Sequence, residues 1–278
     1  MRRVVVLAVV AIALAGCTGT TTPAGPPSAN WIFTKAALDA VTADPSARAR
    51  LSGARIFEIL KGNERPSTAV PVVPTMSFKS VTTLRDTIGA GKLRRDVRAV
   101  IYDSEHWAQT PADEQRDPAG FYRQAAVLAH AHGLIFVATP AMDLVNASGS
   151  RTANPAQVFL ARGIDGSAAR YADVVDIQAQ SLERDPAAYR DFVARATGQI
   201  RSANPAAAVV AGLSTNPHGA AITPGMLVSD MTAVAGAVSG FWLNIPDQGP
   251  NCTDCATPRP DVAVGALTDG RLGTLFGR

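Results

Sequence analysis

Metal-binding and thiol side chains are scarce in this sequence, and neither sign of charge dominates. The 278 residues include 3 cysteines and 4 histidines, and 26 basic side chains stand against 23 acidic ones. This balance does not indicate a nucleic-acid partner. His130 and His132 are two residues apart on an expected helix and so do not face one another, while His106 and His218 are isolated in loops. We therefore predict neither a metal site nor a cofactor.

The apolar run at the N-terminus is too short to span a bilayer. Residues 4–13 follow the basic Arg2 and Arg3 and lead into Leu14-Ala15-Gly16-Cys17. This pattern resembles a bacterial lipoprotein signal. The resemblance implies cleavage before Cys17, lipidation of its thiol and an extracytoplasmic chain anchored to the outer face of the cell membrane. The alternatives are an ordinary signal peptide and an uncleaved apolar tail.

The remaining chain reads as a tether followed by one domain. Loss of residues 1–16 would leave 24 basic and 23 acidic side chains. Residues 17–29 contain the lipidated Cys17 and then mostly Thr, Pro, Gly and Ser, which predicts a flexible tether. A composition with 47% hydrophobic and 18% charged residues is sufficient for one large core, so we expect residues 30–278 to form a single, monomeric domain.

Short runs rich in Val, Ile and aromatic residues predict buried strands separated by helices. The expected strands are 54–60, 70–76, 97–103, 134–139, 173–180, 207–213 and 238–245. Helices are expected at 118–132, 186–203 and 223–235, the first two after the N-cap residues Asp117 and Asp185. This alternation predicts a parallel sheet, and we favour a (β/α)8 TIM barrel closed by an eighth strand near 31–34. An open doubly wound sheet would want a Gly-rich phosphate loop after its first strand, and residues 60–66 lack that spacing.

Two carboxylates stand at the end of the third expected strand. Alternation places Asp103 and Glu105 on the same face, with Cα atoms roughly 6.5 to 7 Å apart. At that distance each charge raises the pKa of the other, which is how a general acid is made. The other interpretation is a strand that ends in a solvated, acidic loop.

Polar side chains also end the other expected strands, where a barrel builds its site. Asp176, Gln178 and Gln180 alternate with apolar residues, so three polar side chains would enter one face. Buried amides left unpaired cost about 1 to 3 kcal/mol each, so a ligand or a carboxylate should satisfy them. Other candidates at strand ends are Asn216, Trp242 and Asn244, and Trp107 follows Glu105. Both tryptophans could instead be core residues.

A strand ending in Asp-x-Glu, with amides and a Trp on later strands, resembles glycoside hydrolases of the chitinase class (family 18) and the muramidase class (family 25). The resemblance implies that Glu105 protonates the glycosidic oxygen, that Asp103 orients or stabilises, and that Trp242 floors a sugar subsite. This sequence departs from the chitinases at Ala99-Val100-Ile101-Tyr102, where their acidic signature is longer, and at Ile177-Gln178-Ala179-Gln180, where they have Met-x-Tyr.

Further roles follow from the same hypothesis. A two-carboxylate mechanism needs a partner roughly 5 to 9 Å from Glu105, and Asp176 is preferred over Asp143 for it. Trp107 and Trp242 would stack on sugar faces while Gln178, Gln180, Asn216 and Asn244 bond hydroxyl groups. The polar loop 108–118 is either a lid over the site or a solvated connection.

Cys252 and Cys255 form a Cys-x-x-Cys pair after the last expected strand. In a reducing compartment this pair could be redox-active or half of a zinc site, whereas outside the membrane it predicts a small structural disulfide.

Three functions remain open on the sequence alone. The first is a lipid-anchored glycoside hydrolase, the second a non-catalytic carbohydrate-binding protein of the cell envelope, and the third a structural envelope protein. An intact Asp-x-Glu beside inward polar residues favours the enzyme.

Overall fold

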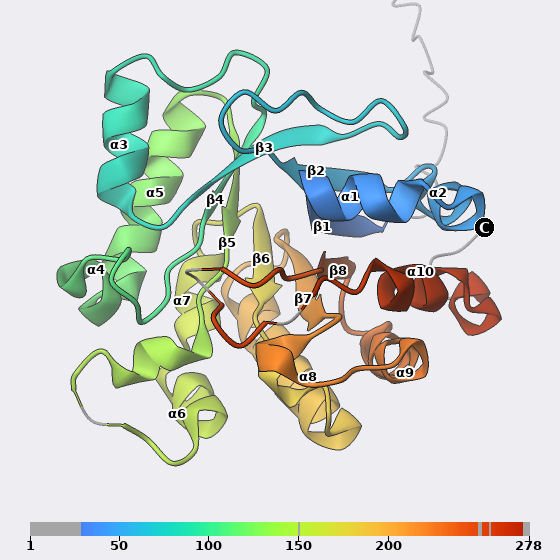
Figure 1. Ribbon diagram of the computed structural model, residues 1–278. Coiled ribbons are helices and arrows are strands. Elements are labelled where there is room, and N and C mark those ends of the chain that lie inside the picture. The colour runs from blue at the N-terminus through green and yellow to red at the C-terminus, as the bar shows by residue number, and fades with distance from the viewer. Residues whose placement is uncertain (1–28, 150, 250–251, 256, 275–278) are drawn as a thin grey trace, which may run out of the picture.

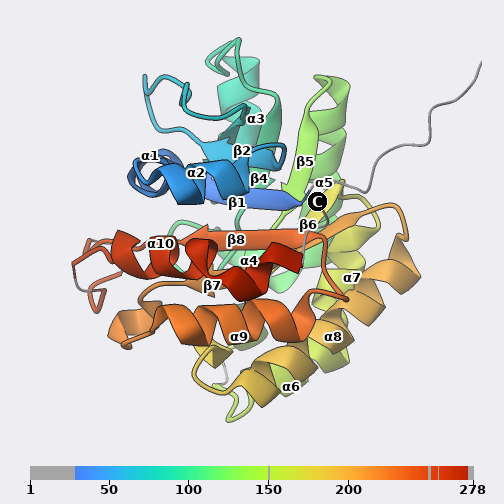
Figure 2. The same ribbon diagram turned by 90° about the vertical axis from the view of Figure 1, so that its right-hand side faces the viewer.

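The chain folds into a closed barrel of eight parallel strands, in the order β1-β2-β3-β4-β5-β6-β7-β8. We describe residues 29–149, 151–249, 252–255 and 257–274 of a computed structural model. β1 and β8 lie side by side and close the ring, with Ile32 paired to Trp242. Figures 1 and 2 show the strands at the centre and the helices outside them. The (β/α)8 architecture predicted from the sequence is therefore confirmed.

The strands and helices alternate along most of the chain. The strands are β1 Asn30–Thr34, β2 Arg55–Ile59, β3 Val73–Phe78, β4 Ala99–Tyr102, β5 Ile135–Ala138, β6 Val174–Ile177, β7 Ala208–Ser214 and β8 Gly240–Asn244. The helices are α1 Lys35–Thr42, α2 Pro45–Leu51, α3 Val81–Gly89, α4 Ala112–Arg116, α5 Pro118–Ala131, α6 Pro155–Arg162, α7 Ile164–Ala169, α8 Pro186–Ala203, α9 Pro224–Val234 and α10 Pro260–Thr268. Short 3₁₀ turns are η1 Met142–Asn146, η2 Gln180–Leu182, η3 Pro217–Gly219 and η4 Gly270–Thr274.

Helix starts follow the local rules that the sequence suggested. The side chain of Asp117 accepts a hydrogen bond from the backbone of Gly120 at the start of α5. Asp185 does the same for Ala187 and Ala188 at the start of α8. In both helices a proline occupies the first turn, where its missing N–H costs nothing.

One βα unit has no helix. Residues 60–72 connect β2 to β3 as an irregular segment, which Figure 1 shows between α1 and α3. The carboxylate of Glu58, a buried residue of β2, holds this segment in place. The N–H of Ser67 donates to both of its oxygens, at 2.9 and 3.2 Å. A buried acceptor therefore holds the loop where a barrel normally has a helix.

The core has two layers because strand side chains alternate between faces. The inner layer fills the barrel, and its members include Ile32, Phe57, Ile101, Val137, Val174 and Val210. The outer layer lies between strands and helices and contains Val100, Tyr102, Val175 and Ile177. Since Ile101 and Val174 face inward, the residues two positions later, Asp103 and Asp176, also face the barrel interior.

The observed strand boundaries differ from the predicted ones by one or two residues at most ends and by three residues at two of them. The run predicted at 70–76 pairs only from Val73, and β3 continues to Phe78. The run predicted at 173–180 ends as a strand at Ile177, and Gln180 begins the turn η2. The strand expected near 31–34 is present as β1 and supplies the eighth member of the barrel.

Residues 1–28 lie outside the described part of the chain, so the predicted signal, the lipidated Cys17 and the tether stay predictions. Among the residues described, no helix combines the length and apolar content needed to cross a membrane.

Candidate active site

Asp103 follows β4 directly and lies at the carboxyl end of the barrel, with 5% of its surface exposed. One carboxylate oxygen accepts hydrogen bonds from the Thr139 hydroxyl at 2.9 Å and from the Gln178 amide at 3.1 Å. The other oxygen forms an ion pair with the ammonium group of Lys79. Three donors thus converge on one buried carboxylate and satisfy both of its oxygens.

Glu105 lies two residues further along the same loop and is half-buried. Burial and then the negative charge of Asp103 raise its pKa to about 8, with a smaller contribution from Asp143, while Lys79 opposes the shift. The N–H of Glu105 donates to the Thr110 hydroxyl at 3.4 Å. Glu105 is therefore a protonated carboxylic acid at neutral pH, next to a charged carboxylate, which is the state that a general acid requires.

Trp107 is fixed beside this pair by Lys79 and Thr110. The Lys79 ammonium lies 4.7 Å from the centre of the Trp107 ring, which is cation–π geometry. The indole N–H donates to the Thr110 hydroxyl at 2.8 Å, and that hydroxyl donates to the Lys79 carbonyl at 2.8 Å. Lys79 consequently contacts both the buried carboxylate of Asp103 and the ring of Trp107.

The loop 108–118 contains the short helix α4 and a buried carboxylate. Glu114 is fully buried and accepts hydrogen bonds from the Val81 N–H at 2.8 Å and from the Tyr102 hydroxyl at 2.8 Å. A third, longer bond comes from the Thr82 N–H at 3.3 Å. These hydrogen bonds hold the loop against the start of α3 and against β4. The loop therefore packs beside the site and does not extend into solvent.

Asp176 enters the barrel from β6 and is completely buried. Neither of its carboxylate oxygens has a hydrogen-bond partner in the described residues. Burial, followed by the charges of Asp103 and Asp165, holds the pKa of Asp176 well above its ordinary value. The assignment of Asp176 as the second carboxyl group of the mechanism stays a prediction.

Asp143, the other candidate for that role, lies in η1. Its carboxylate accepts the His106 N–H at 2.9 Å. Burial raises the pKa of Asp143, and the bond from His106 opposes the rise. Asp143 thus fixes the backbone next to Glu105 and adds to the negative potential there.

Gln178 and Gln180 both lie at the mouth of the barrel, although only Gln178 bonds to the carboxylate. The Gln178 amide also donates to the Thr139 carbonyl at 2.9 Å. The Gln180 side chain lies over Gly212 of β7, so closely that a Cβ on Gly212 would come within 2.6 Å of its amide nitrogen. A glycine at 212 therefore leaves the space that the Gln180 side chain occupies.

The candidates from β7 and β8 lie on the same rim. Trp242 packs on the inner core layer, and its buried indole N–H has no partner among the described residues. Asn244 ends β8 paired with Ser214, and its carbonyl accepts the Thr215 N–H at 3.0 Å. Asn216 is buried, and its N–H donates to the Ser214 hydroxyl at 3.1 Å. The binding roles of these three residues remain predictions.

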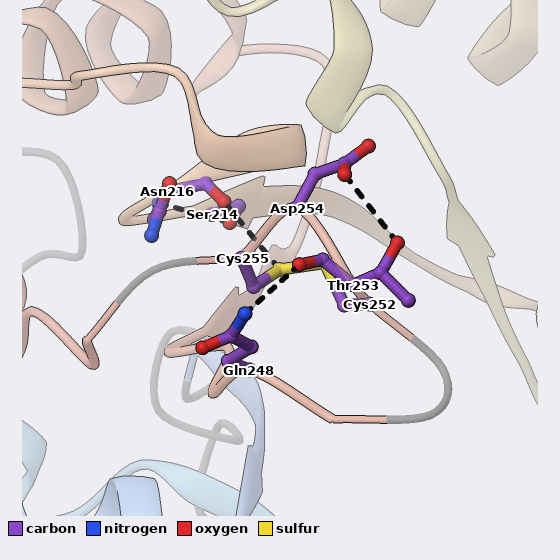
Figure 3. Close-up of a disulfide and its surroundings, with 7 residues drawn as sticks. All are labelled: Ser214, Asn216, Gln248, Cys252, Thr253, Asp254 and Cys255. Carbon is purple, nitrogen blue, oxygen red and sulfur yellow. Dashed lines mark hydrogen bonds between the residues drawn. A yellow bond between two sulfur atoms is a disulfide. The ribbon is translucent and has the colours of Figure 1, made fainter.

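The Cys-x-x-Cys pair forms the structural disulfide that the sequence favoured. Cys252 and Cys255 are bonded, with Cα atoms 5.3 Å apart, and the Cys255 sulfur lies 4.0 Å from the Asn216 carbonyl oxygen. Figure 3 shows this disulfide beside Asn216, with the Gln248 amide donating to the Thr253 carbonyl at 3.2 Å. The disulfide therefore packs the loop after β8 against the loop after β7.

Lys79, Thr110 and Glu114 take part in the site without having been singled out in the sequence. Lys79 was missed because the second predicted strand ended at residue 76, whereas β3 continues to Phe78 and makes Lys79 its first following residue. The sequence signal that could have pointed to Lys79 was the run Ser77-Phe78-Lys79-Ser80, in which a lysine directly precedes the N-cap residue of a helix. Glu114 and Thr110 carry no comparable signal, because their partners are distant in the sequence.

Several solved structures share this barrel at low sequence identity. A chitinase from Chromobacterium violaceum is 14% identical, with 89% of this chain and 100% of that chain aligned at a TM-score of 0.48. A putative alpha-L-fucosidase from Bacteroides thetaiotaomicron is 10% identical at a TM-score of 0.43, over 70% of this chain and 61% of that one. Triosephosphate isomerase from Bartonella henselae is 11% identical at 0.42, over 86% and 98%.

At these identities and TM-scores the similarity assigns neither a family nor an activity to this chain. No family model matches the sequence, and no curated protein is detectably similar to it. The chain is a (β/α)8 barrel.

Proposed function

We propose that this protein is a lipid-anchored, extracytoplasmic glycoside hydrolase that acts on a glycan of the envelope or the surroundings. The observation that carries the proposal is the pairing of Asp103, whose carboxylate is held by three donors, with Glu105, whose pKa is raised to about 8. A protonated carboxylic acid beside a second carboxyl group is what acid-catalysed cleavage of a glycosidic bond requires.

Glu105 would donate its proton to the leaving glycosidic oxygen. Its carboxyl group forms no side-chain hydrogen bond in the described part of the chain, so it is available to a ligand. Asp103 would stabilise the positive charge that develops on the sugar, either directly or through an acetamido group of the substrate. Trp107 and Trp242 would offer aromatic faces to sugar rings, and Gln180 would bond a hydroxyl group.

The alternative is a carbohydrate-binding protein without catalysis. It is favoured by the occupied state of Asp103, whose two oxygens already bind Lys79, Thr139 and Gln178. A carboxylate so fully satisfied could serve to hold the mouth of the barrel in shape.

Release of reducing ends distinguishes the two functions. Residues 29–278 contain both core layers and the closed barrel, so this segment is a suitable soluble enzyme. It would be incubated with peptidoglycan, chitin oligomers and plant glycans beside a Glu105→Gln variant of equal thermal stability. Release by the parent and its loss of at least 1000-fold in the variant are expected. Equal binding of one glycan by both proteins, without release, would establish the binding protein instead.

The anchor is tested separately by mass spectrometry of the full chain produced in a bacterium. We expect a lipid-modified N-terminal Cys17, and an unprocessed chain when Cys17 is changed to Ser. An unmodified Cys17 in the parent protein would remove the lipoprotein part of the proposal.

A further inference from the structure

The end of the barrel opposite the candidate active site carries exposed, unneutralised cations. They lie in the loops and helix ends that lead into the strands, and they are Arg55, Lys92, Arg95, Arg98, Arg170 and Arg201. Within the described residues none of the six pairs with a carboxylate. Arg98 and Arg201 donate only to backbone carbonyls, and Arg55 lies 5.0 Å from the ring centre of Phe57.

Most of the carboxylates near this end are already engaged, whereas the exposed side chain of Asp86 in the last turn of α3 forms no hydrogen bond or ion pair within the described residues. Asp96 pairs with Arg94 at 2.7 Å. Asp173 accepts hydrogen bonds from His130 at 3.0 Å and from the Phe136 N–H at 2.7 Å. Asp44 caps α2. A hollow of about 480 Å³ at this end is lined by residues that include Arg55, His130 and Asn204. This end of the barrel therefore presents net positive charge around a shallow hollow.

The opposite end carries charges of both signs. The loops that follow the strands hold carboxylates, including Asp103, Asp113, Asp143, Asp185 and Asp247, and also the cations Lys35, Lys61, Lys79, Arg116 and Arg184. The excess of positive charge therefore lies at the end where the strands begin. A molecule with an uneven charge distribution orients itself in the field of a charged surface, even though its formal charge is small.

The chain also enters the barrel at the cationic end. Asn30, the first residue of β1, pairs with Arg55 and with Gly240, which begin β2 and β8. Residues 17–28 contain no charged side chain and cannot neutralise this end. As a flexible chain they would have a root-mean-square length of about 19 Å, and fully extended they would span about 40 Å. An anchor at Cys17 would thus hold the cations near the bilayer, where electrostatic attraction acts over about 8 Å.

We propose that the cationic end of the barrel docks on an anionic lipid bilayer, so that the candidate active site faces away from the membrane. A bilayer presents a flat array of phosphates, which fits cations spread around the rim of a barrel better than a narrow polyanion does. The inference rests on the proposed lipid anchor for proximity, whereas it is independent of catalysis. A basic surface would add electrostatic attraction to the attachment that the lipid anchor supplies.

The test uses the unlipidated segment 29–278, which holds the complete core, and vesicles of phosphatidylcholine with or without one-third phosphatidylglycerol. A triple variant Lys92→Gln, Arg95→Gln, Arg170→Gln removes three cations whose side chains form no hydrogen bond or ion pair within the described residues. A matched variant Lys61→Gln, Arg116→Gln, Arg184→Gln removes the same charge from the opposite end. Co-sedimentation at low salt measures the partition coefficient of each protein.

We expect the parent domain to bind only the vesicles that contain phosphatidylglycerol. At about fivefold per cation, the first variant should bind about 100-fold more weakly, and the matched variant should bind like the parent. Equal losses in both variants would show a response to net charge alone and overturn the proposal. So would binding to pure phosphatidylcholine, or stronger binding to a DNA duplex at the same phosphate concentration. Lipid analysis of Cys17 reads out the anchor independently.

Discussion

The ammonium group of Lys79 forms an ion pair with the carboxylate of Asp103, and the pair joins the ends of the neighbouring strands β3 and β4. The same ammonium group lies over the ring of Trp107. Its positive charge lowers the pKa of Glu105, against the larger effects of burial and of Asp103. One lysine therefore contacts Asp103, influences the pKa of Glu105 and holds the ring of Trp107 in place.

Replacement of Lys79 by Met should move the pH profile as well as the rate. Without the ammonium group the pKa of Glu105 rises further, so the alkaline limb of kcat/KM shifts to higher pH, and kcat/KM at pH 7 falls about 100-fold through loss of positioning. Lys79→Arg, which keeps the charge, should leave the alkaline limb in place. A uniform loss of rate with unmoved limbs in Lys79→Met would contradict this role.

The activity should fall at alkaline pH because Glu105 must be protonated to act as an acid. With a pKa raised to about 8, the group is protonated below that value and ionised above it. We expect kcat/KM on any cleaved glycan to be nearly constant from pH 6 to 7 and to fall tenfold for each pH unit well above 8. Activity that stays constant up to pH 10 would exclude Glu105 as the acid.

Asp230 offers a test of buried charge away from the site. It lies in α9, has no hydrogen-bond partner among the described residues, and has a pKa raised by burial to about 7. Because the folded-state pKa lies above the ordinary value, the stability that the protonated group contributes is present at low pH and is lost as pH rises through about 7. Asp230→Asn should therefore raise the free energy of unfolding by about 2 kcal/mol at pH 8 and change it little at pH 4.5.

The control for Asp230 is Asp191→Asn on the exposed face of α8, where the carboxylate pairs with Arg190 at the surface. Urea unfolding at the two pH values should show no comparable pH-dependent gain. A pH-independent effect of Asp230→Asn would mean that this carboxyl group does not titrate between pH 4.5 and 8.

Glu114 should be a large contributor to stability. Glu114→Ala leaves the Val81 and Thr82 N–H groups and the buried Tyr102 hydroxyl without their acceptor. We expect a loss of about 3 kcal/mol in the free energy of unfolding, measured by urea denaturation. Asp113→Ala, on the exposed side of the same short helix, should cost about 0.5 kcal/mol or less. Similar losses in both variants would contradict the assignment of Glu114 as the fastener of the loop.

Gly212 and Gln180 should behave as a coupled pair. A methyl group in Gly212→Ala would strike the Gln180 amide, which is the movable end of a flexible side chain, so the fold should persist while Gln180 is displaced. If Gln180 bonds the glycan, Gly212→Ala and Gln180→Ala should each weaken glycan binding about tenfold, and the double variant no further. Calorimetric titration with the bound glycan measures this. Additive losses would show that the two positions act separately.

The fold could be predicted from the sequence because the patterns that indicate it are local. Strand composition, the Asp117 and Asp185 caps and the prolines after them are all read within a few residues. The inward direction of Asp103 could be predicted from the alternation of a single strand, whereas Glu105 lies beyond the end of β4, where alternation no longer applies. The network around them could not be predicted, since Lys79, Thr139 and Gln178 come from three other strand ends and meet Asp103 only through the register of the barrel. Their contacts depend on sheet closure, which no local pattern encodes.

The irregular segment between β2 and β3 leaves this part of the barrel without a covering helix. Elsewhere a helix buries the outer face of each strand pair, but here the covering is residues 60–72, with Glu58 and Ser67 as the inner fastening. Local opening starts where few apolar contacts must be broken, so hydrogen exchange and proteolysis should reach β2 and β3 before the remaining strands. Although hydrogen bonds close the barrel on every side, its local unfolding should therefore begin at β2 and β3.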